Sequence, residues 1–303
     1  MATNILITGG TGLIGRHLTE QFERKGYSVT HLSRSRRGEN KEKTYIWDIH
    51  KSFIEDGALE NANIVIHLAG AGVTDARWTS SRKKEILDSR VQSTRLLHQK
   101  LKDQSTPLEA FICASAIGIY GSDLSDDWKE EGTSFGNDFL AQVTEAWEAE
   151  AKELTQLENR VVLLRIGVVL SGEGGALGKL AKPIKLGIGA VLGSGKQYMS
   201  WIHIEDLCGI FEQAVTDKTM EGPYNTVAPQ PVTNKEMTQA MAKLLNRSLV
   251  LPAVPGFALK LALGEMAEIV LNGGRVSSKK IEKAGYEFKF PQLTMALEDL
   301  LHR

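Results

Sequence analysis

The chain has 303 residues, of which 42% are hydrophobic and 24% charged, and its formal net charge at pH 7 is −1. This is an ordinary globular composition, without the basic footprint of a nucleic-acid-binding protein. The N-terminus lacks the pattern of a signal peptide, and no apolar run reaches the length of a membrane span. We expect a cytoplasmic protein without a nucleic-acid or membrane partner, as a monomer or homodimer. The two cysteines, Cys113 and Cys208, stand in apolar surroundings and indicate neither a disulfide framework nor a metal site.

Strand and helix patterns alternate along the first part of the chain. Helical spacing or polar helical character predicts helices over 13–26, about 79–103 and about 138–155. β-rich or apolar runs predict strands at 4–8, 27–33, 44–49, 63–72, within ICASAIGIYG (112–121) and at 160–170. Such a β-α-β order predicts a Rossmann-type α/β fold, with a doubly wound parallel sheet and right-handed crossovers.

The second part of the chain has a different pattern. Residues 174–197 are rich in glycine and apolar residues, contain lysines but no acidic residue, and are predicted to form a loop. A short strand and a helix follow at 199–215, then a strand, a proline loop and a helix at 222–245, and the last 60 residues are mainly helical. We therefore predict a nucleotide-binding domain of 1–170 plus about 200–230. A smaller, mainly helical substrate-side lobe would comprise 171–199 and 231–303.

The first predicted loop, TGGTGLIG, places Gly9, Gly12 and Gly15 three residues apart. The first glycine permits a tight turn, the second lets a pyrophosphate approach the backbone, and the third lets the helix pack on the strand. The phosphates would then lie at the helix N-terminus, where free N–H groups and the helix dipole favour anions. Because a strand precedes this loop and a helix follows it, we predict that Gly9, Thr11, Gly12, Leu13, Ile14 and Gly15 bind a dinucleotide.

The end of the second predicted strand indicates which dinucleotide binds. An acidic residue at this position would bond the ribose 2′-OH of NAD. This chain has Ser33 and then Arg34, with Arg36 and Arg37 close behind. Guanidinium groups suit a 2′-phosphate, because their planar fork matches phosphate oxygens. The run predicts NADP(H), and a solvated basic loop is the alternative.

Other candidate cofactor contacts follow the third and fourth predicted strands. Asp48 could accept a hydrogen bond from the adenine amine, or it could cap a helix. Leu68, Ala69 and Gly70 end the fourth strand, where the backbone must pass near the cofactor. On the next helix Glu85 could face the same edge of the sheet, although most charges on such a helix face water.

Several of these motifs resemble a known family. TGGTGLIG, HLAG, LLRIGVVL and WIHIEDL are together similar to the extended short-chain dehydrogenase/reductases of the NAD-dependent epimerase/dehydratase family. ARWTSSRKKEILDSRVQSTRLL, GSGKQYMSWIHIEDL, GPYNTVAPQPVTN and the tail from 252 to 293 resemble a narrower subgroup, labelled "epimerase family protein" or NADP-linked oxidoreductase, with a C-terminal segment of unknown function. The resemblance covers essentially the whole chain and implies NADP(H) binding, but no settled substrate. It implies cofactor contacts at Ser33, Arg34, Leu68, Ala69, Glu85, Arg90 and Val169.

The resemblance also raises a catalytic question. The family mechanism uses a Tyr-x-x-x-Lys pair on the helix after the fifth strand, and these positions hold Leu140 and Thr144 here, or Phe139 and Val143 if the register shifts by one. No Tyr-x-x-x-Lys sequence occurs anywhere in the chain. What remains are two hydroxyl groups, Ser115 and Tyr120, with one residue more between them than in ordinary members. We predict these two as catalytic.

Other side chains would surround those hydroxyls. Arg90 would supply the positive group near Tyr120, and Trp201 and His203 would line the pocket together with the loop 174–197. For His203 we favour the alternative that it caps the helix that begins near Asp206.

Two interpretations stay open. The chain is an NADP(H)-dependent reductase, dehydrogenase or epimerase that uses Ser115 and Tyr120 in a different way, on a small carbonyl, alcohol or nucleotide-sugar-like substrate. Alternatively it is a regulatory module that binds NADPH without turnover, such as a regulator of cell division, since some relatives carry a cell-division-inhibitor label.

Overall fold

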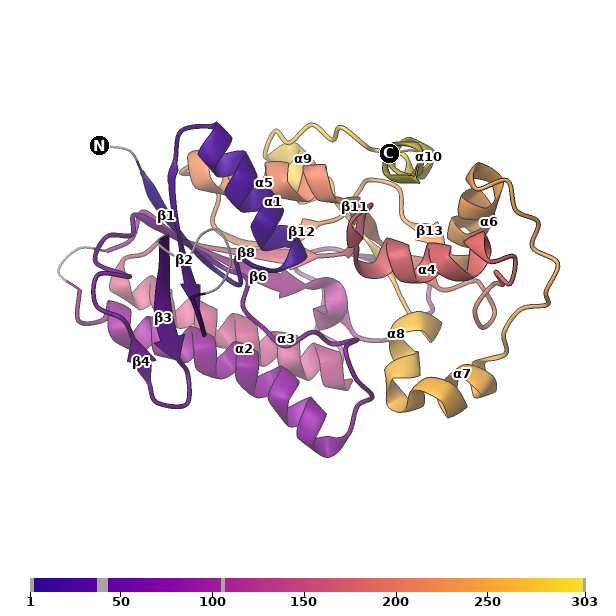
Figure 1. Cartoon of the computed structure of the whole chain (residues 1–303), viewed down its shortest axis with the longest axis horizontal. Coiled ribbons are helices and arrows are strands. Elements are labelled where there is room, and N and C mark those ends of the chain that lie inside the picture. The colour runs from indigo at the N-terminus through magenta and orange to yellow at the C-terminus, as the bar shows by residue number, and fades with distance from the viewer. Residues whose placement is uncertain (1–2, 37–42, 105–106, 302–303) are drawn as a thin grey trace.

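The apolar strand runs assemble into one eight-stranded sheet in the computed structural model, which describes residues 3–36, 43–104 and 107–301 (Figure 1). The strands lie in the order β12-β8-β6-β5-β1-β2-β3-β4, and all neighbouring pairs except β3–β4 are parallel. The strand order reverses between β1 and β5, which is the switch point where doubly wound sheets bind ligands. The strands are β1 (Asn4–Thr8), β2 (Ser28–Ser33), β3 (Thr44–Asp48), β4 (Phe53–Ile54), β5 (Ile64–His67), β6 (Ala110–Ala116), β8 (Val161–Ile166) and β12 (Gly222–Thr226).

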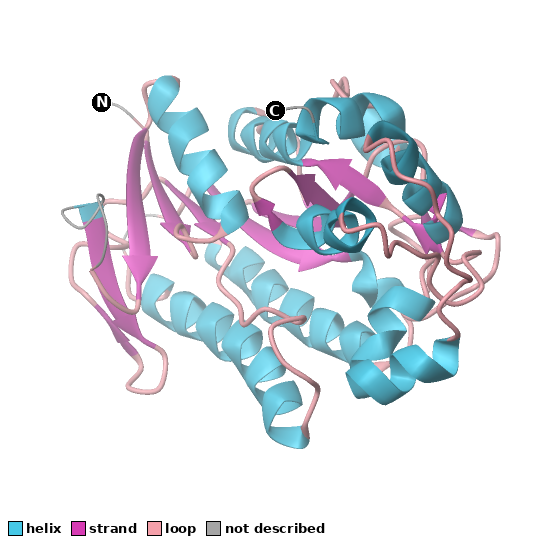
Figure 2. Ribbon diagram, turned by 45° about the vertical axis from the view of Figure 1, so that its right-hand side comes forward, coloured by secondary structure: helices cyan, strands magenta, loops and turns pink. Residues whose placement is uncertain are grey.

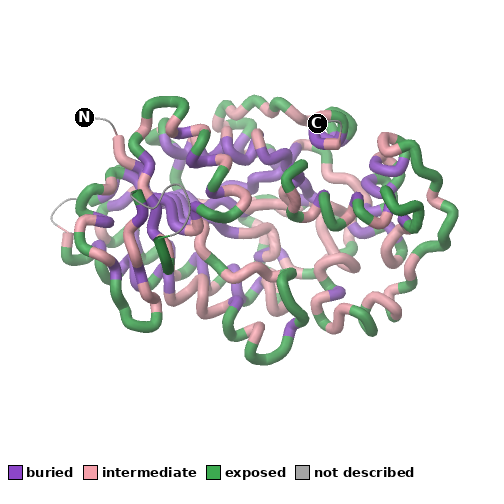
Figure 3. Tube along the Cα trace, viewed as in Figure 1, coloured by how far each residue is buried: buried purple, intermediate pink, exposed green. Residues whose placement is uncertain are grey.

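Helices cover both faces of this sheet. In Figure 1, α1 (Leu13–Arg24) and α5 (Ile204–Thr216) lie above it, while α2 (Ser80–Leu101) and α3 (Phe139–Lys152) lie below. The alternation of strand side chains explains why the strands are apolar throughout. In β1, Ile5 and Ile7 join the core beneath α1 and α5, whereas Leu6 joins the opposite core. Figure 3 shows the buried residues concentrated on these strands and on the inner sides of the helices. The predicted Rossmann-type fold is confirmed.

The remaining elements are short strands and further helices (Figure 2). None of the helices in the described ranges is long and apolar enough to cross a membrane. The short strands are β7 (Trp128–Lys129), β9 (Val168–Ser171), β10 (Tyr198–Met199), β11 (Trp201–His203), β13 (Val232–Thr233) and β14 (Arg275–Val276). The helices are η2 (Ile117–Tyr120), η3 (Glu153–Leu157), α4 (Gly175–Lys185), α6 (Asn234–Leu244), α7 (Gly256–Leu263), η4 (Gly264–Ala267), α8 (Glu268–Leu271), α9 (Lys279–Lys283) and α10 (Leu293–Leu301).

The C-terminal segment packs against the main domain from the side. Met266 and Ile269 contact an apolar cluster that includes Trp78, just before α2, and Val143 of α3. An ion pair between Lys83 and Glu265 strengthens the same contact. Helix α10 packs on α6 and β9. The C-terminal helices thus close one side of the region beyond the carboxyl ends of the strands.

The structure corrects the predicted strand at 160–170, which is two strands. It breaks at Gly167, where β8 stays in the main sheet and β9 pairs with β11. The N–H of Val168 donates to the Ser200 carbonyl at 2.9 Å, and a Cβ on Gly167 would lie 2.4 Å from that carbonyl oxygen. The chain can leave the sheet here only because glycine permits this close approach.

Two further predictions on secondary structure were wrong in part. Of the predicted strand 63–72 only 64–67 pairs in the sheet, because the N–H groups of Leu68 and Ala69 donate to the Thr8 hydroxyl, each at 3.1 Å. The predicted loop 174–197 contains the helix α4, whose buried residues are Leu177, Ala181 and Ile184. This helical spacing is hidden in the sequence by glycines and by Pro183 within the helix.

A buried histidine holds the end of β5 in place. His67 is fully buried, and its Nδ1 lies 2.8 Å from the Thr8 hydroxyl oxygen. Because that hydroxyl already accepts two backbone N–H bonds, its own proton is donated to Nδ1. Nε2 then carries the ring proton and faces the hydroxyls of Ser93 and Thr94, at 3.2 and 3.1 Å. Burial lowers the pKa of His67 to about 3, and the charge of Arg90 acts in the same direction.

We expect His67 to make the protein less stable as the pH falls. The unfolded histidine binds a proton below its ordinary pKa of about 6.5, while the folded one stays neutral down to about 3. The free energy of unfolding should therefore fall by about 1.4 kcal/mol per pH unit between these values because of this group alone. Urea unfolding at pH 7, 6, 5 and 4 should show this slope reduced in His67→Asn relative to wild type. His50→Asn, at an exposed histidine, is the matched control, and equal slopes for wild type and His67→Asn would contradict the prediction.

Candidate functional site

The glycine loop after β1 leads directly into the N-terminus of α1. Helix α1 begins at Leu13, its N-cap is Gly12, and no side chain caps it or places an acidic group in its first turn. Gly9 has a φ of 70°, and a Cβ on Gly15 would lie 2.5 Å from the Gly9 carbonyl oxygen. The helix N-terminus is therefore left for an anion. All six predicted residues, Gly9 and Thr11 to Gly15, lie in this loop or in the first turn of α1, and their geometry fits a dinucleotide pyrophosphate.

Of the two described arginines in the basic run after β2, one has a guanidinium group that is available to a ligand. Ser33 is the last residue of β2, and Arg34 is exposed and has no hydrogen bond or ion pair to any other described residue. Arg36 is already engaged, since its Nε donates to the Thr44 carbonyl at 3.0 Å and its guanidinium pairs with Glu55. Arg37 lies outside the described residues. Of the described arginines of this run, Arg34 is thus the one that is placed to meet a ligand.

Asp48 caps a turn at the end of β3. Its Oδ1 accepts the backbone N–H groups of His50 and Lys51, at 3.0 and 3.2 Å. No helix follows it, so the alternative of a helix N-cap is wrong. Its contact with adenine stays a prediction.

Arg90 supports the loop after β5 instead of the catalytic region. Its Nη1 donates to the carbonyls of Ala71 and Ile86, at 2.9 and 3.0 Å, and its guanidinium lies 5.2 Å from the centre of the Trp147 ring. A Cβ on Gly70 would lie 3.1 Å from the Arg90 Cζ, so the loop runs directly over this side chain. Burial lowers the pKa of Arg90 to about 10, with a smaller effect from Arg82. The expectation that Arg90 is the positive group near Tyr120 is wrong.

The two other predicted contacts occupy different environments. Glu85 is exposed on α2 and pairs with Arg82, whose Nη1 lies 2.7 Å from its Oε2. Val169 is half-buried in β9, where its register partner is Ile202 of β11. Neither position is settled as a cofactor contact, and both stay predictions.

The positive group beside Tyr120 is Arg165, which belongs to a buried polar network. Arg165 binds Glu148 with two bonds, of 2.8 Å from Nε and 2.9 Å from Nη2. Its Nη1 donates to the Tyr120 hydroxyl at 3.0 Å, and this hydroxyl donates to Asn225 at 2.6 Å. The Ser115 hydroxyl donates to Glu148 Oε1 at 2.6 Å. These five side chains are all buried, with Arg165 and Glu148 each only 1% exposed.

The network sets the protonation of its members. Burial acts to lower the pKa of Arg165, but the Glu148 carboxylate outweighs it, and the net shift is upward. Burial raises the pKa of Tyr120, against the opposing charge of Arg165. At neutral pH, Arg165 is therefore a cation and Tyr120 a neutral phenol. The sequence signals for the missed residues are an arginine inside the apolar strand VVLLRI and a glutamate on the buried face of α3.

The Ser115 hydroxyl lies on the side of β6 that faces α3, where it donates to Glu148. Successive side chains of a strand point to opposite faces. The position one residue later, Ala116, carries only a methyl group. Ser115 is not among the residues that line the neighbouring cavity.

A cavity of about 620 Å³ lies beyond the carboxyl ends of the strands. The main domain contributes Tyr120, Gly118 and Leu140, while α4 and the C-terminal segment supply the facing wall. Leu140, one of the two candidates for the tyrosine position, lines the cavity, and the hydroxyl of Thr144 is buried and donates to the Leu140 carbonyl at 2.7 Å. The segment 174–197 lines the cavity as predicted, although mainly through α4.

Trp201 and His203 do not line this cavity, which corrects their predicted placement. Both are fully buried, and Trp201 Nε1 donates to the Gln230 carbonyl at 2.9 Å. His203 is the N-cap of α5, and its Nδ1 accepts the Glu205 N–H at 3.1 Å. The favoured alternative, a histidine that caps a helix, is confirmed.

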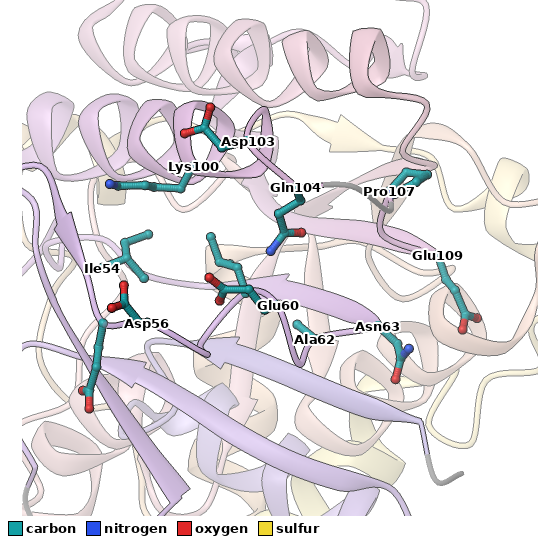
Figure 4. A pocket seen from close by; sticks show the side chains of 12 residues that line it. Ile54, Asp56, Glu60, Ala62, Asn63, Lys100, Asp103, Gln104, Pro107 and Glu109 are labelled. Atoms are coloured by element: carbon teal, nitrogen blue, oxygen red, sulfur yellow. The ribbon is translucent and has the colours of Figure 1, made fainter.

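A second cavity, of about 680 Å³, lies at the other end of the strands, opposite their carboxyl ends (Figure 4). Its lining residues Asn63 and Glu109 immediately precede β5 and β6, so it adjoins the amino ends of the strands. The glycine loop and the Tyr120 network both lie at the carboxyl ends. The second cavity is therefore separate from the candidate site.

We expect Glu148→Gln to lower the free energy of unfolding by about 3–5 kcal/mol, because it leaves the Arg165 charge buried without its counter-ion. The double variant Glu148→Gln with Arg165→Met should recover part of this loss, because both charges are gone. Glu150→Gln, on the same helix, should cost less than about 1 kcal/mol, since Glu150 pairs with the exposed Arg95. Urea unfolding measures all three variants. A loss for Glu148→Gln no larger than that for Glu150→Gln would argue against a buried ion pair.

Comparison with known proteins gives matches over most of the chain. Residues 5–227 match the NAD dependent epimerase/dehydratase family, and residues 254–300 match a domain of unknown function. The epimerase family protein YfhF of Bacillus subtilis (strain 168) is 37% identical over 299 residues, which are 98% of each chain. An epimerase family protein of Staphylococcus aureus (strain NCTC 8325 / PS 47) is 36% identical over 296 residues, also 98% of each chain.

Two solved structures are similar over nearly the whole chain. The human epimerase family protein SDR39U1 (isoform 2), solved with NADPH, has a TM-score of 0.90 and 31% identity, covering 99% of this chain and 100% of that one. A nucleoside-diphosphate sugar epimerase from Corynebacterium glutamicum has a TM-score of 0.81 and 31% identity over 99% of this chain, which spans 58% of that protein. By its sequence and by its fold, this chain belongs to the NAD dependent epimerase/dehydratase family.

Proposed function

We propose that this chain is an NADP(H)-dependent oxidoreductase or epimerase-like enzyme that acts on a small carbonyl compound or the corresponding alcohol. The observation that carries this proposal is the cavity of about 620 Å³ beside the glycine loop. Gly175 lines the cavity, and a Cβ on it would lie 3.3 Å from Leu13 of that loop. Cavities of this size that are largely apolar and contain a few polar groups are typical small-molecule sites.

Each part of the chain has a role in this proposal. Residues 1–170 with about 200–230 would bind the cofactor, and 171–199 with 231–303 would form the substrate side. The capless N-terminus of α1 would hold the pyrophosphate, and Ser33 and Arg34 would hold the 2′-phosphate. The NADPH present in the human SDR39U1 structure supports the same choice of cofactor. The remaining proposed contacts are Asp48, Leu68, Ala69, Gly70, Glu85, Arg90 and Val169.

When bound, NADPH supplies a hydride from C4 of its nicotinamide ring to the carbonyl carbon. Tyr120 is the proposed proton donor to the carbonyl oxygen, because it is one of the residues that line the cavity and its raised pKa keeps it protonated. The phenol would exchange its Asn225 acceptor for the substrate oxygen. Arg165, 3.0 Å from the phenolic oxygen, would stabilise the phenolate until water returns the proton. Ser115 is a positioning residue in this scheme, since it reaches Arg165 only through Glu148.

A second function is favoured by a specific observation. The hydroxyls of Ser115 and Tyr120 both donate to groups inside the protein, and Leu140 and Thr144 supply no ionisable pair. A module that binds NADPH without turnover would need neither a free hydroxyl group nor an ionisable pair at these positions. Hydride transfer distinguishes the two functions.

For the cofactor, we expect NADPH to bind more tightly than NADH in calorimetric titrations. Arg34→Ala should weaken NADPH binding at least about tenfold, because a charge-assisted hydrogen bond contributes about 1.5–3 kcal/mol. The same variant should leave NADH binding unchanged. Arg36→Ala is the matched control, because that guanidinium is already bound by Thr44 and Glu55. NADH binding as tight as NADPH binding in the wild type would refute the assignment.

For the chemistry, we expect wild type to transfer deuterium from C4-labelled NADPH to members of a carbonyl library. Tyr120→Phe should lower this rate by about 10² or more, since it removes the proton donor, and should leave NADPH affinity unchanged. Mass spectrometry of the products and nicotinamide absorbance follow the reaction. An unchanged rate in Tyr120→Phe removes Tyr120 from the mechanism. Tight NADPH binding without any transfer by the wild type favours the module.

A further inference from the structure

We infer that the cavity beside Tyr120 accepts a largely apolar carbonyl compound or alcohol that is neutral or cationic, and that it excludes sugars carried on a nucleoside diphosphate. This inference rests on the proposed function, because it names the substrate class of the same cavity. Its basis is the chemistry of the lining. The apolar members come from both parts of the chain and are Trp78, Ile117, Leu140, Val168, Leu180, Leu192, Met199, Ile269, Val270 and Val276.

The charges of the lining disfavour an anion. Two lysines, Lys129 and Lys179, face four carboxylates, and neither arginine nor histidine is among the described lining residues. The formal charge of the wall is therefore −2, counted as two positive and four negative side chains. The carboxylates are Asp75, Asp123, Asp138 and Glu268. A diphosphate that entered this cavity would lose its hydration and meet net negative charge.

Both lysines are already bound. The Nζ of Lys129 lies 2.5 Å from Oδ2 of Asp123. This bond and the backbone N–H of Ser125 lower the pKa of Asp123 to about 2, so the pair carries no net charge at neutral pH. The Nζ of Lys179 donates to the Thr74 hydroxyl at 2.9 Å and so joins α4 to the loop after β5. Neither lysine offers the planar, bidentate donor group that suits a phosphate best.

The apolar surface is continuous where a substrate would approach Tyr120. Leu140 lies next to Gly118 and packs in one cluster with Trp78 and Ile269. Three segments therefore form this wall of the cavity. The first is the loop that precedes α2, the second is α3, and the third is α8, which belongs to the C-terminal domain of unknown function. The C-terminal domain thus contributes both apolar surface and, through Glu268, negative charge. It would set the substrate class of the cavity.

The test compares two fluorescent dyes that differ mainly in charge. N-phenylnaphthylamine is neutral, and anilinonaphthalene sulfonate carries an anionic group on a similar ring system. With the full chain saturated with NADPH, the neutral dye should bind at least about tenfold more tightly than the sulfonate. UDP-glucose should not displace it. Leu140→Gln should weaken the neutral dye at least about tenfold, whereas Leu186→Gln, at a leucine that is 67% exposed and lies outside the cavity lining, should not.

Three results would overturn the inference. The first is sulfonate binding as tight as that of the neutral dye, and the second is displacement of the neutral dye by UDP-glucose. The third is failure of the neutral dye to bind in the cavity, which would be seen as no binding at all or as binding that is lost in Leu186→Gln but not in Leu140→Gln. NADPH affinity, measured separately by calorimetry, distinguishes this failure from that of the proposed function. Loss of NADPH binding would refute the proposed function, and reversed dye preference with NADPH bound would refute only the substrate class.

Discussion

The buried ion pair between Arg165 and Glu148 is the interaction on which the candidate site depends. It joins β8 to α3 through two hydrogen bonds, and both side chains are almost fully buried. Two charges in such a place are tolerated only when each is compensated and hydrogen-bonded. The further bonds of this pair reach Ser115 and Tyr120, so the orientation of both hydroxyls follows from the pairing of the charges.

A similar arrangement supports the cofactor side. The hydrogen bond between His67 and Thr8 joins the end of β5 to β1. Arg90 donates to the Ala71 carbonyl and so fixes the loop that follows β5. Buried polar groups of this kind favour one loop conformation, because any displacement would leave a donor or acceptor unpaired. Arg90 and Arg165 thus have separate roles. Arg90 supports the loop at the switch point, and Arg165 supports the residues beside the cavity.

The C-terminal segment gives the cavity its character. Residues after the sheet strands line one side of the cavity. Helix α8 and the residues after it line part of the facing side. Because Trp78, Leu140 and Ile269 come from distant parts of the sequence and pack together, the wall exists only in the folded chain. An apolar wall with net negative charge restricts which ligands can enter, whatever the chemistry at Tyr120.

The sequence by itself determined the Rossmann-type fold, the order of its main elements and the glycine loop. These follow from local requirements, namely continuous apolar strands, helical spacing and turns that only glycine permits. It missed the break at Gly167 and the helix within 174–197, because a close approach to Ser200 and a helix interrupted by Pro183 leave no clear local pattern. It also assigned the wrong arginine to Tyr120. Only the tertiary structure decided that Ser115 faces Glu148, 33 residues away, and that Tyr120 meets Arg165, 45 residues away. The face on which a hydroxyl lies depends on strand register and on partners that folding brings together.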